Sequence, residues 1–484
     1  MKKLKVLYAT SEVSPLIKTG GLADVSGALP AALRDIKVDV RVLVPGYNQV
    51  MAQLPQHKEI AKFELSGFPF ARLLSGTMPN GVPVMVLECP ILYQRDGGPY
   101  QTPRGHDWAD NAIRFGLLSK VAAVLGSASS PLSWHPDLVQ CNDWQTGLTP
   151  AYLHFEIGAA PSVIAIHNMA FQGIFPPEAV QQLGLPPSSY SINGVEFHGS
   201  MSFLKAGLFY ADHITTVSPN YAREIQQEEL GFGMQGLLSA RSESLTGILN
   251  GIDTDEWNPA TDAHLAKTYT KDKMAGKVAN KEALQHRMGL EIDPDIPLLG
   301  VVSRLTHQKG LDLLLEIAPL LCRLPAQLVI LGSGDAKMQT TAKELSQLYP
   351  GQIGVMIGFD EGLSHQIEAG ADIFVMPSRF EPCGLNQLYS QRYGTPPIVH
   401  ATGGLEDSVV DCTEATLKDG TASGFKFKGE TAINLYSTIL RAIDTYRDKK
   451  QWSALCGNCM AKEFSWKISA EEYLAVYNKV LGRI

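Results

Sequence analysis

The stretch LLGVVSRLTHQKGLDLLLEIAPLLC, residues 298–322, contains one complete strand–loop–helix unit. Residues 298–304 are apolar until they end in Ser303-Arg304, and residues 311–322 repeat leucine at helical spacing. A strand that is apolar throughout has to be buried on both faces, as in a parallel sheet covered by helices. This stretch therefore predicts an α/β fold.

The same alternation of short apolar runs and helical patterns extends through the whole chain, which predicts two Rossmann-like domains. We place the first domain at 1–250 and the second at 251–464, with a hinge at Asn250-Gly251-Ile252-Asp253. The helical spacing of 465–484 is compatible with a return to the first domain. Strands are expected at 4–10, 38–45, 84–89, 138–142, 162–167, 213–218, 298–304, 327–331, 353–358, 372–377 and 397–401. Helices are expected at 21–33, 109–125, 146–155, 311–322 and 431–446.

The composition argues against several classes of protein. The 484 residues are 45% hydrophobic and 19% charged, as in ordinary globular proteins. The net charge of -8 makes a nucleic-acid partner a poor expectation. No apolar run approaches the roughly 20 residues of a membrane span, so we expect no membrane partner. The oligomeric state is not readable from the sequence.

Two features of the chain indicate its cellular location. The start, Met1-Lys2-Lys3, resembles a signal peptide, but Lys5 and Glu12 interrupt the apolar stretch, and a first strand is the better interpretation. The seven cysteines follow no regular spacing, which fits a reducing compartment. We read Cys456 and Cys459 as two thiols on a helix and expect a cytoplasmic, bacterial protein.

Two cations flank the loop after the strand quoted first. In open parallel sheets, ligands gather beyond the carboxyl ends of the strands. Arg304 and Lys309 lie at such an end, where they could neutralise a diphosphate as it leaves in the transition state. The alternative is a pair of solvated basic residues, but their position at a strand end favours function.

The run Pro377-Ser378-Arg379-Phe380-Glu381-Pro382-Cys383-Gly384-Leu385 leads from another strand into a helix. A carboxylate at this turn could hold sugar hydroxyls, and Glu381 is the candidate. The backbone amides of Cys383, Gly384 and Leu385 would face an anion at the start of the helix. An ordinary helix entry also uses Glu and Pro, but rarely the whole run.

Glycine loops follow three further strands and are candidates for donor binding, because glycine lets backbone amides approach a phosphate. Taken alone, the first of these loops is better interpreted as an ordinary turn with a surface lysine, and the second is a weak signal by itself. The residues are Lys18, Gly20 and Gly21 after the first strand, Gly332 and Gly334 later, and Thr402, Gly403 and Gly404 near the end of the second domain.

Polar residues also end two strands of the first domain. His167 follows one strand and Asp143 follows another, beside Trp144. A histidine in such a place is more often a packed core residue than a catalyst. Asp143 with Trp144 looks like a polar–aromatic platform for a carbohydrate, whereas His198 and Lys205 are weaker candidates.

Metal and cofactor motifs are poorly represented. Metal-dependent transferases need Asp-x-Asp at the end of a strand, but Asp253-Thr254-Asp255 lies in the expected hinge and Asp293-Pro294-Asp295 precedes a strand. Gly-x-Ser-x-Gly, His-Glu-x-x-His and the full dinucleotide fingerprint do not occur. We therefore expect no catalytic metal and no cofactor.

Taken together, these segments resemble the family of bacterial glycogen synthases and plant starch synthases over essentially the whole chain. The resemblance implies a metal-free GT-B glycosyltransferase, in which two Rossmann-like domains face each other across a cleft that holds the active site. It would move glucose, with retention, from ADP-glucose to the non-reducing end of an α-1,4-glucan such as glycogen. It also implies that the Lys18 loop contacts the donor, Arg304 and Lys309 bind the diphosphate, Glu381 contacts the donor glucose, and His167 and Asp143 lie near the anomeric carbon and acceptor. The matching segments are Lys18-Thr19-Gly20-Gly21-Leu22-Ala23-Asp24-Val25, His167-Asn168, Phe203-Leu204-Lys205-Ala206-Gly207, Ser303-Arg304-Leu305-Thr306, Gln308-Lys309-Gly310-Leu311, Arg379-Phe380-Glu381-Pro382-Cys383-Gly384-Leu385 and Thr402-Gly403-Gly404-Leu405.

One position departs from the pattern of related retaining transferases. They have Glu eight residues after the first Glu of this turn, whereas this chain has Tyr389, so ribose recognition must differ from theirs.

Three alternatives to the function that the resemblance implies stay open at this stage. Spacing does not separate adenine from uracil, which leaves a UDP-glucose or sucrose-type transferase. A nucleotide-sugar epimerase could share the fold, and a glucan-binding protein without activity is the third alternative.

Overall fold

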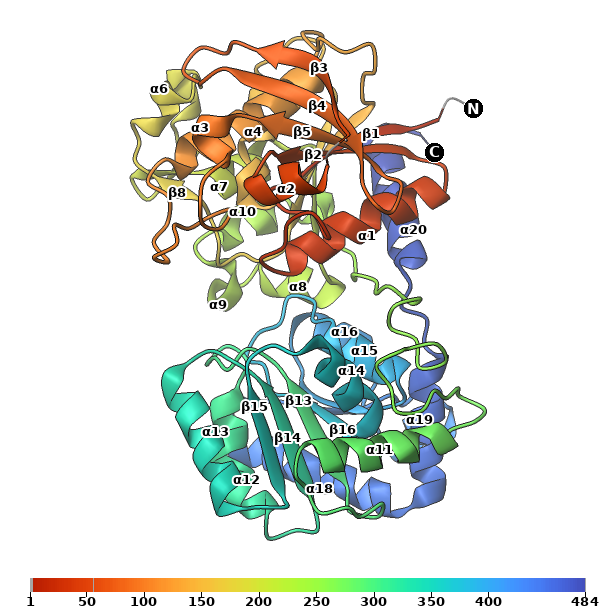
Figure 1. The fold of residues 1–484 in the computed structure, drawn as a ribbon. Coiled ribbons are helices and arrows are strands. Elements are labelled where there is room, and N and C mark those ends of the chain that lie inside the picture. Colours follow the sequence, from red (N-terminus) through yellow and green to blue (C-terminus); the bar gives the residue numbers. More distant parts are fainter. Residues whose placement is uncertain (1–2, 55, 484) are drawn as a thin grey trace. The chain divides into compact units, whose positions relative to one another are not determined.

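The computed structural model describes residues 3–54 and 56–483 and divides into two compact units (Figure 1). Unit 1 comprises the chain up to Gly251 together with the segment from Trp466 onward, and unit 2 comprises Ile252–Ser465. The boundaries placed from the sequence differ from these by one residue at each junction. The C-terminal segment thus belongs to the same unit as the N-terminal strand.

A mixed sheet forms the centre of the described part of unit 1, with the strand order β12-β11-β7-β6-β1-β2-β5-β4-β3. The strands from β12 to β5 are parallel, as their continuous apolar sequences predicted. Every residue of β6 and β7 is buried. The bounds are β1 Lys5–Ala9, β2 Asp39–Pro45, β5 Pro83–Glu88, β6 Leu138–Asn142, β7 Ser162–Ile166, β11 His213–Thr216 and β12 Leu245–Gly247.

An antiparallel extension at one edge of this sheet was not predicted. Strands β3 (Lys58–Phe63) and β4 (Ala71–Thr77) pair antiparallel with each other, and β4 pairs antiparallel with β5. β3 is largely exposed and carries two lysines, so it lacks the apolar run by which the buried strands were recognised. A separate small sheet has the order β8 (Ile174–Phe175), β10 (Ser200–Ser202) and β9 (Glu196–Phe197).

The helices of unit 1 include α20 (Trp466–Val480), which packs against α1 (Gly21–Asp35). The Tyr477 hydroxyl donates to Gln140 Oε1 at 3.1 Å, and the Ser469 hydroxyl donates to the Leu249 carbonyl at 2.7 Å. The first bond joins the end of the chain to β6 of the central sheet, and the second joins it to the segment that follows β12. The other helices are α2 (Asn48–Gln53), α3 (Pro90–Tyr93), α4 (Asn111–Leu125), α5 (Leu148–His154), α6 (Ala179–Gln182), α7 (Phe203–Tyr210), α8 (Pro219–Glu224), α9 (Glu228–Gly231) and α10 (Gln235–Ala240).

Unit 2 is built on a parallel sheet with the strand order β15-β14-β13-β16-β17-β18. Alternate side chains of β13 belong to different apolar clusters: Leu299 and Val301 to one, Leu298 to the other. Because successive side chains of a strand point to opposite faces, the sheet is covered on both sides. The bounds are β13 Leu298–Val302, β14 Gln327–Gly332, β15 Ile353–Ile357, β16 Ile373–Met376, β17 Pro397–His400 and β18 Phe425–Phe427.

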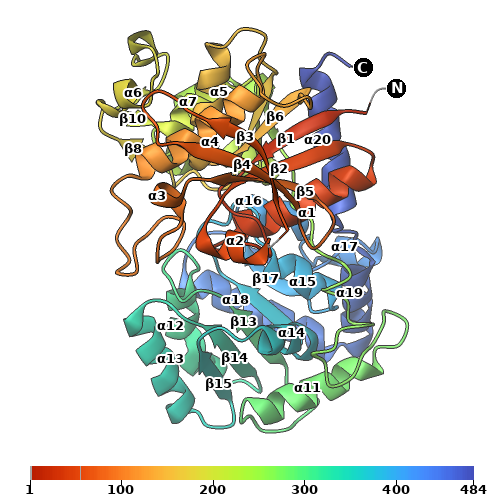
Figure 2. The same cartoon turned by 45° about the horizontal axis from the view of Figure 1, so that its top comes forward.

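The helices of unit 2 divide between the two faces. One cluster contains apolar residues of α12, α13, α18 and α19, and the other contains residues of α11, α14 and α16. Figure 2 shows these helices around the sheet. Their bounds are α11 Ala275–Arg287, α12 Leu311–Leu321, α13 Ala336–Leu348, α14 Glu361–Gly370, α15 Asn386–Arg392, α16 Gly403–Ser408, α17 Glu414–Lys418, α18 Ala432–Arg447 and α19 Lys449–Ala461.

The strand order of unit 2 reverses between β13 and β16. The chain first adds β14 and β15 on one side of β13, and then places β16, β17 and β18 on the other side. Such a switch point leaves a crevice at the carboxyl ends of the two central strands. Among the described helices, none is both long and apolar enough to cross a bilayer.

Candidate active site

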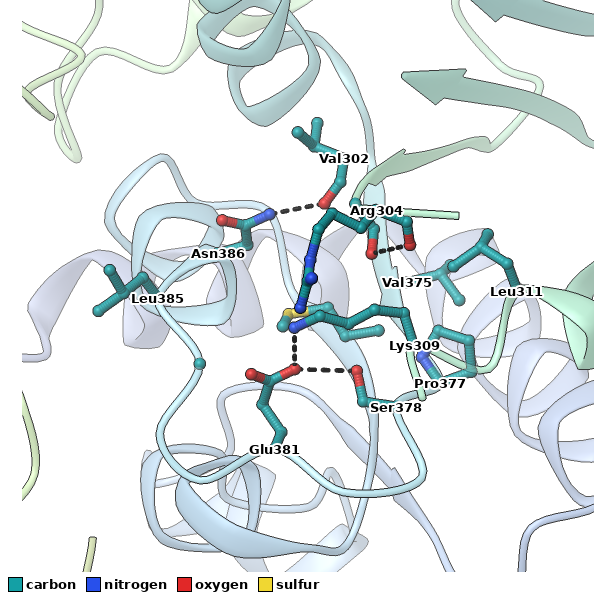
Figure 3. A pocket seen from close by; sticks show the side chains of 13 residues that line it. Val302, Arg304, Lys309, Leu311, Val375, Pro377, Ser378, Glu381, Leu385 and Asn386 are labelled. Atoms are coloured by element: carbon teal, nitrogen blue, oxygen red, sulfur yellow. Dashed lines mark hydrogen bonds and ion pairs between the residues drawn. The ribbon is translucent and has the colours of Figure 1, made fainter. Parts of the chain in front are cut away.

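A cavity of about 210 Å³ opens in unit 2 at the carboxyl ends of β13 and β16, where a switch point predicts a ligand site. Figure 3 shows it from close by. Both predicted cations and the predicted carboxylate belong to its lining. The lining residues are Val302, Ser303, Arg304, Lys309, Leu311, Val375, Met376, Pro377, Ser378, Glu381, Gly384, Leu385 and Asn386.

An ion pair between Lys309 and Glu381 forms one side of the cavity. Lys309 Nζ lies 2.5 Å from Glu381 Oε2, and the Ser378 hydroxyl donates to the same oxygen at 3.0 Å. Both charged side chains are mostly buried, with exposed fractions of 19% for Lys309 and 9% for Glu381. A carboxylate held by two donors has one orientation, which suits the recognition of sugar hydroxyls.

The charge of the lining favours an anion. Arg304 and Lys309 provide two positive charges, and Glu381 provides one negative charge. Figure 3 shows the side chains of Arg304 and Lys309 pointing into the cavity. Arg304 is exposed at this point, so its guanidinium is accessible to a ligand. Fixed cations in a partly enclosed space stabilise phosphate oxygens more strongly than cations in open water do.

Two glycines allow the loops around the cavity to lie close together. A Cβ at Gly332 would lie 1.8 Å from the Ser303 carbonyl oxygen, and a Cβ at Gly403 would lie 1.9 Å from the Glu381 carbonyl oxygen. Gly403 also has a φ of +46°, which disfavours other residues. Gly334 and Gly404 take part in the same two close approaches. These four glycines shape the loops that carry Arg304 and Glu381, and they do not line the cavity.

The remaining predicted residues of this region divide into two groups. Gly384 and Leu385 line the cavity beside Glu381, at the start of α15. Cys383 and Thr402 are buried and lie outside the lining, with Thr402 directly before α16. The first two are in place to contact a ligand in this cavity, whereas donor binding by the other two stays a prediction.

The Lys18 loop of unit 1 is held by a carboxylate that the sequence analysis did not single out. Glu12 Oε2 accepts the backbone N–H groups of Thr19 and Gly20, and Glu12 Oε1 accepts the Tyr100 hydroxyl. A Cβ at Gly20 or Gly21 would meet no atom within 4 Å, so packing does not require glycine there. Glu12 thus holds the loop in place, and the space around Gly20 and Gly21 stays open.

Asp143 and His167 lie in contact at the carboxyl ends of the neighbouring strands β6 and β7. The His167 backbone N–H donates to Asp143 Oδ1 at 2.7 Å, and His167 Nε2 lies 3.2 Å from Asn142 Oδ1. Because the Asn142 amide group donates to the Ala9 carbonyl, its oxygen faces the histidine and assigns the ring proton to Nε2. His167 Nδ1 then carries the free lone pair.

Burial shifts the pKa values of both residues toward their neutral forms. It raises the pKa of Asp143 to about 7, against the opposing effect of backbone hydrogen bonds from His167 and Asn168. Burial lowers the pKa of His167 to about 4. Asp143 also has a φ of +54°, an uncommon conformation for a residue other than glycine. Strained, buried titratable groups of this kind concentrate at functional sites.

Comparison with known proteins identifies the family to which the chain belongs. Residues 5–240 match the family model of the starch synthase catalytic domain, and residues 284–452 match that of glycosyl transferases group 1. The glycogen synthase of Nitrosospira multiformis is 57% identical over 99% of this chain and 98% of its own length. The chain belongs to the glycogen synthase family.

Other relatives of the family agree. The glycogen synthase of Dechloromonas aromatica is 55% identical, with 100% of this chain and 99% of its own length covered. The catalytic domain of starch synthase IV from Arabidopsis thaliana, bound to ADP and acarbose, has a TM-score of 0.86 and 30% identity over 99% of this chain and 100% of its own. The two Rossmann-like units thus have the GT-B fold, as predicted.

One prediction about this member of the glycogen synthase family is wrong. Trp144 does not form a platform for a sugar, because its ring is buried against Phe115, Phe175 and Phe203 at centroid distances of 4.9–6.3 Å. Lys205 is also structural, since its buried ammonium group donates to the carbonyls of Ile192 and Glu196. Both side chains are therefore buried parts of the interior of unit 1.

Three residues beside the predicted ones, two in unit 2 and one in unit 1, were missed from the sequence. Ser378 positions Glu381, and Asn386 donates to the Val302 carbonyl at 2.7 Å on the cavity wall. Glu12 orders the Lys18 loop. Ser378 lies inside the motif that was quoted, and Glu12 lies directly after the first strand, so their positions at strand ends were the available signal.

The Asp-x-Asp motifs and the C-x-x-C pair have local structural roles. Asp253 Oδ1 accepts the backbone N–H of Asp255, and Asp293 Oδ1 accepts that of Asp295, as in turns. Cys456 and Cys459 are free, buried thiols on α19.

Proposed function

We propose that this chain elongates an α-1,4-glucan at its non-reducing end, with retention, by transferring glucose from ADP-glucose and releasing ADP. The observation that carries the proposal is the convergence of Arg304, Lys309 and Glu381 in one cavity at the switch point of unit 2. Membership in the glycogen synthase family supports a glucan acceptor. The ADP bound to the similar starch synthase supports adenine as the donor base.

In this proposal, the cations act on the leaving group. Negative charge develops on the diphosphate as its bond to the anomeric carbon breaks, and Arg304 and Lys309 are already in place to stabilise it. Lys309 also orients Glu381 through their 2.5 Å ion pair. Glu381 is thereby positioned to accept hydrogen bonds from hydroxyls of the donor glucose.

The environment of Glu381 also supports a mechanism without a protein nucleophile. Retaining hydrolases use two carboxylates about 5 Å apart, one of which attacks the anomeric carbon. Within the part of unit 2 that the structure describes, Glu381 is the one carboxylate that lines the cavity. Its charge is engaged by Lys309 and Ser378, which lowers its nucleophilicity. We therefore favour attack on the same face of the sugar, with the leaving diphosphate as the base.

Asp143 and His167 are the proposed residues for the reacting sugar and the acceptor. A neutral imidazole and a carboxyl group that titrates near pH 7 can each hydrogen-bond to sugar hydroxyls without a fixed charge. Lys18 is proposed as a further contact to the donor. The proposal includes no metal in the transfer step and a cytoplasmic location, the latter supported by seven cysteines that are all free thiols.

The deciding experiment measures the nucleotide released from ADP-glucose and from UDP-glucose, with and without glycogen, in the presence of EDTA. We expect ADP release that depends on glycogen and survives EDTA. Faster release from UDP-glucose would assign the chain to a sibling transferase, and turnover without glycogen would favour an epimerase-type reaction. No release from either donor would leave a glucan-binding protein.

A further inference from the structure

A second group of polar side chains in unit 2 lies outside the cavity. One carboxylate oxygen each from Glu256 and Glu361 and one ring nitrogen of His365 lie within 4.8 Å of one another. Glu361 and His365 are four residues apart on α14, a spacing that places two side chains on the same face of a helix. Glu256 comes from the loop at the start of unit 2. None of the three lines the cavity at β13 and β16.

His365 is held in one orientation by its neighbours. Its Nδ1 lies 2.7 Å from Asp262 Oδ2, an oxygen that also accepts the Tyr393 hydroxyl at 2.5 Å. The Trp257 ring stacks on the imidazole with a centroid distance of 3.9 Å and an interplanar angle of 9°. Asp262 therefore selects the tautomer with its proton on Nδ1, which leaves the lone pair on Nε2.

The other nitrogen of this ring is the unexplained feature. The His365 side chain is 2% exposed, and its Nε2 has no hydrogen-bond partner among the residues that the structure describes. Buried polar atoms are nearly always paired with protein, water or an ion, so an unpaired one marks a place where such a partner fits. An Asp–His pair that presents the second ring nitrogen is also the arrangement by which proteins orient a histidine toward a metal ion.

We propose that Glu256, Glu361 and His365 bind a divalent first-row transition metal, with zinc as the representative ion. Two carboxylates and one imidazole provide three protein ligands, and water would complete a tetrahedral site. Bonds of about 2.0–2.2 Å place such ligand atoms roughly 3.3 Å apart, so the cluster has to contract on binding. The anchored ring of His365 stays in place, while the exposed side chains of Glu256 and Glu361 can rotate toward it.

This metal would be structural and separate from glucosyl transfer. It would neutralise two neighbouring carboxylates and join the first loop of unit 2 to α14. Trp257, which follows Glu256, stacks on Tyr389 of α15 as well as on His365, with a centroid distance of 3.8 Å to Tyr389. The ion would therefore hold together the loop, α14 and, through Trp257, α15.

Zinc binding to the EDTA-treated and dialysed full-length protein tests the proposal. Calorimetric titration should give one site, and Co²⁺ should give the visible absorption of an ion with nitrogen and oxygen ligands. Glu256→Gln and Glu361→Gln should each weaken zinc binding by at least about tenfold, because each removes a charged ligand. Both positions are exposed, so both variants should fold.

The matched control is Glu344→Gln, an exposed glutamate on α13 of the same unit. It should keep wild-type zinc affinity and the rise in melting temperature that zinc produces. Wild-type protein that takes up no zinc or cobalt would overturn the proposal. Wild-type affinity in both Glu256→Gln and Glu361→Gln would also overturn it, because the ion would then bind elsewhere.

Discussion

Replacing Lys309 with methionine removes one charge of a mostly buried ion pair and leaves Glu381 without its cation. At 2.5 Å and an effective dielectric constant of about 20, the gross attraction between the two groups is about 7 kcal/mol. Most of this is offset by the cost of removing both charges from water. Breaking one half of a buried pair costs about 3–5 kcal/mol, and the remaining exposure of Lys309 places this site near 3 kcal/mol.

The same substitution should reduce turnover by a separate amount. Loss of one fixed group opposite a charge that develops in the transition state lowers kcat by about 10²–10³, which corresponds to about 2.7–4 kcal/mol. Lys309→Met should therefore unfold at lower denaturant concentration and also release ADP far more slowly. The two effects have to be separated, because a destabilised enzyme can lose activity for structural reasons alone.

The double variant Lys309→Met/Glu381→Gln separates them. It removes both charges together, so stability should return to within about 1 kcal/mol of wild type, because no unpaired buried charge remains. Turnover should stay at least as low as in Lys309→Met, since the cation is still missing. The measurements are denaturant unfolding and glycogen-dependent ADP release, with the exposed Lys337→Met on α13 as the matched control.

Two results would refute this reasoning. Turnover of Lys309→Met within about threefold of wild type would show that the cation does not act on the leaving group. Recovery of turnover in the double variant would show that Lys309 serves only to neutralise Glu381.

Two further predictions concern unit 1. The pKa of Asp143 is raised to about 7, so this group lowers the stability of the folded protein as the pH rises from about 4 to 7. The pKa of His167 is lowered to about 4, so this group raises the stability of the folded protein as the pH rises from about 4 to 6.5. Asp143→Asn should therefore make the slope of stability against pH more positive, and His167→Asn should make it more negative, each by up to about 1.4 kcal/mol per pH unit. Curves parallel to that of the wild type in denaturant titrations at several pH values would contradict the assigned burial effects. Lys18→Ala removes a 56% exposed side chain paired with Asp24 at 2.7 Å, so stability should change by less than about 1 kcal/mol while KM for the nucleotide-sugar rises. An unchanged KM in initial-rate assays would remove Lys18 from the donor site.

The class of fold and the places where chemistry could occur followed from local sequence. Continuous apolar runs such as those of β6 and β13 identify buried parallel strands, because only a strand covered on both faces is apolar throughout. Arg304 and Glu381 were recognised because each follows such a strand. The antiparallel strands β3 and β4 were missed, since β3 is largely exposed and polar residues flank the short apolar run of β4.

The functions of individual glycines and aromatic residues were not determined by local sequence. Gly332 and Gly403 were recognised only as candidates for donor binding, whereas the folded chain also requires glycine at both positions because one backbone passes close to another. Trp144 looked like a sugar platform beside Asp143, but Phe115, Phe175 and Phe203 cover its ring. In each case the deciding neighbour is remote in the sequence, so no local pattern records it.

The sequence by itself determined the alternation of strands and helices, the two-unit organisation and the polar residues at the strand ends. The tertiary structure decided which of those residues meet. It placed β16 beside β13, which brings Glu381 to Lys309 across 72 positions of the chain, and it enclosed the Asp262–His365 pair across 103. Periodicity reports how each segment is buried, whereas strand order and side-chain pairing depend on packing between distant segments.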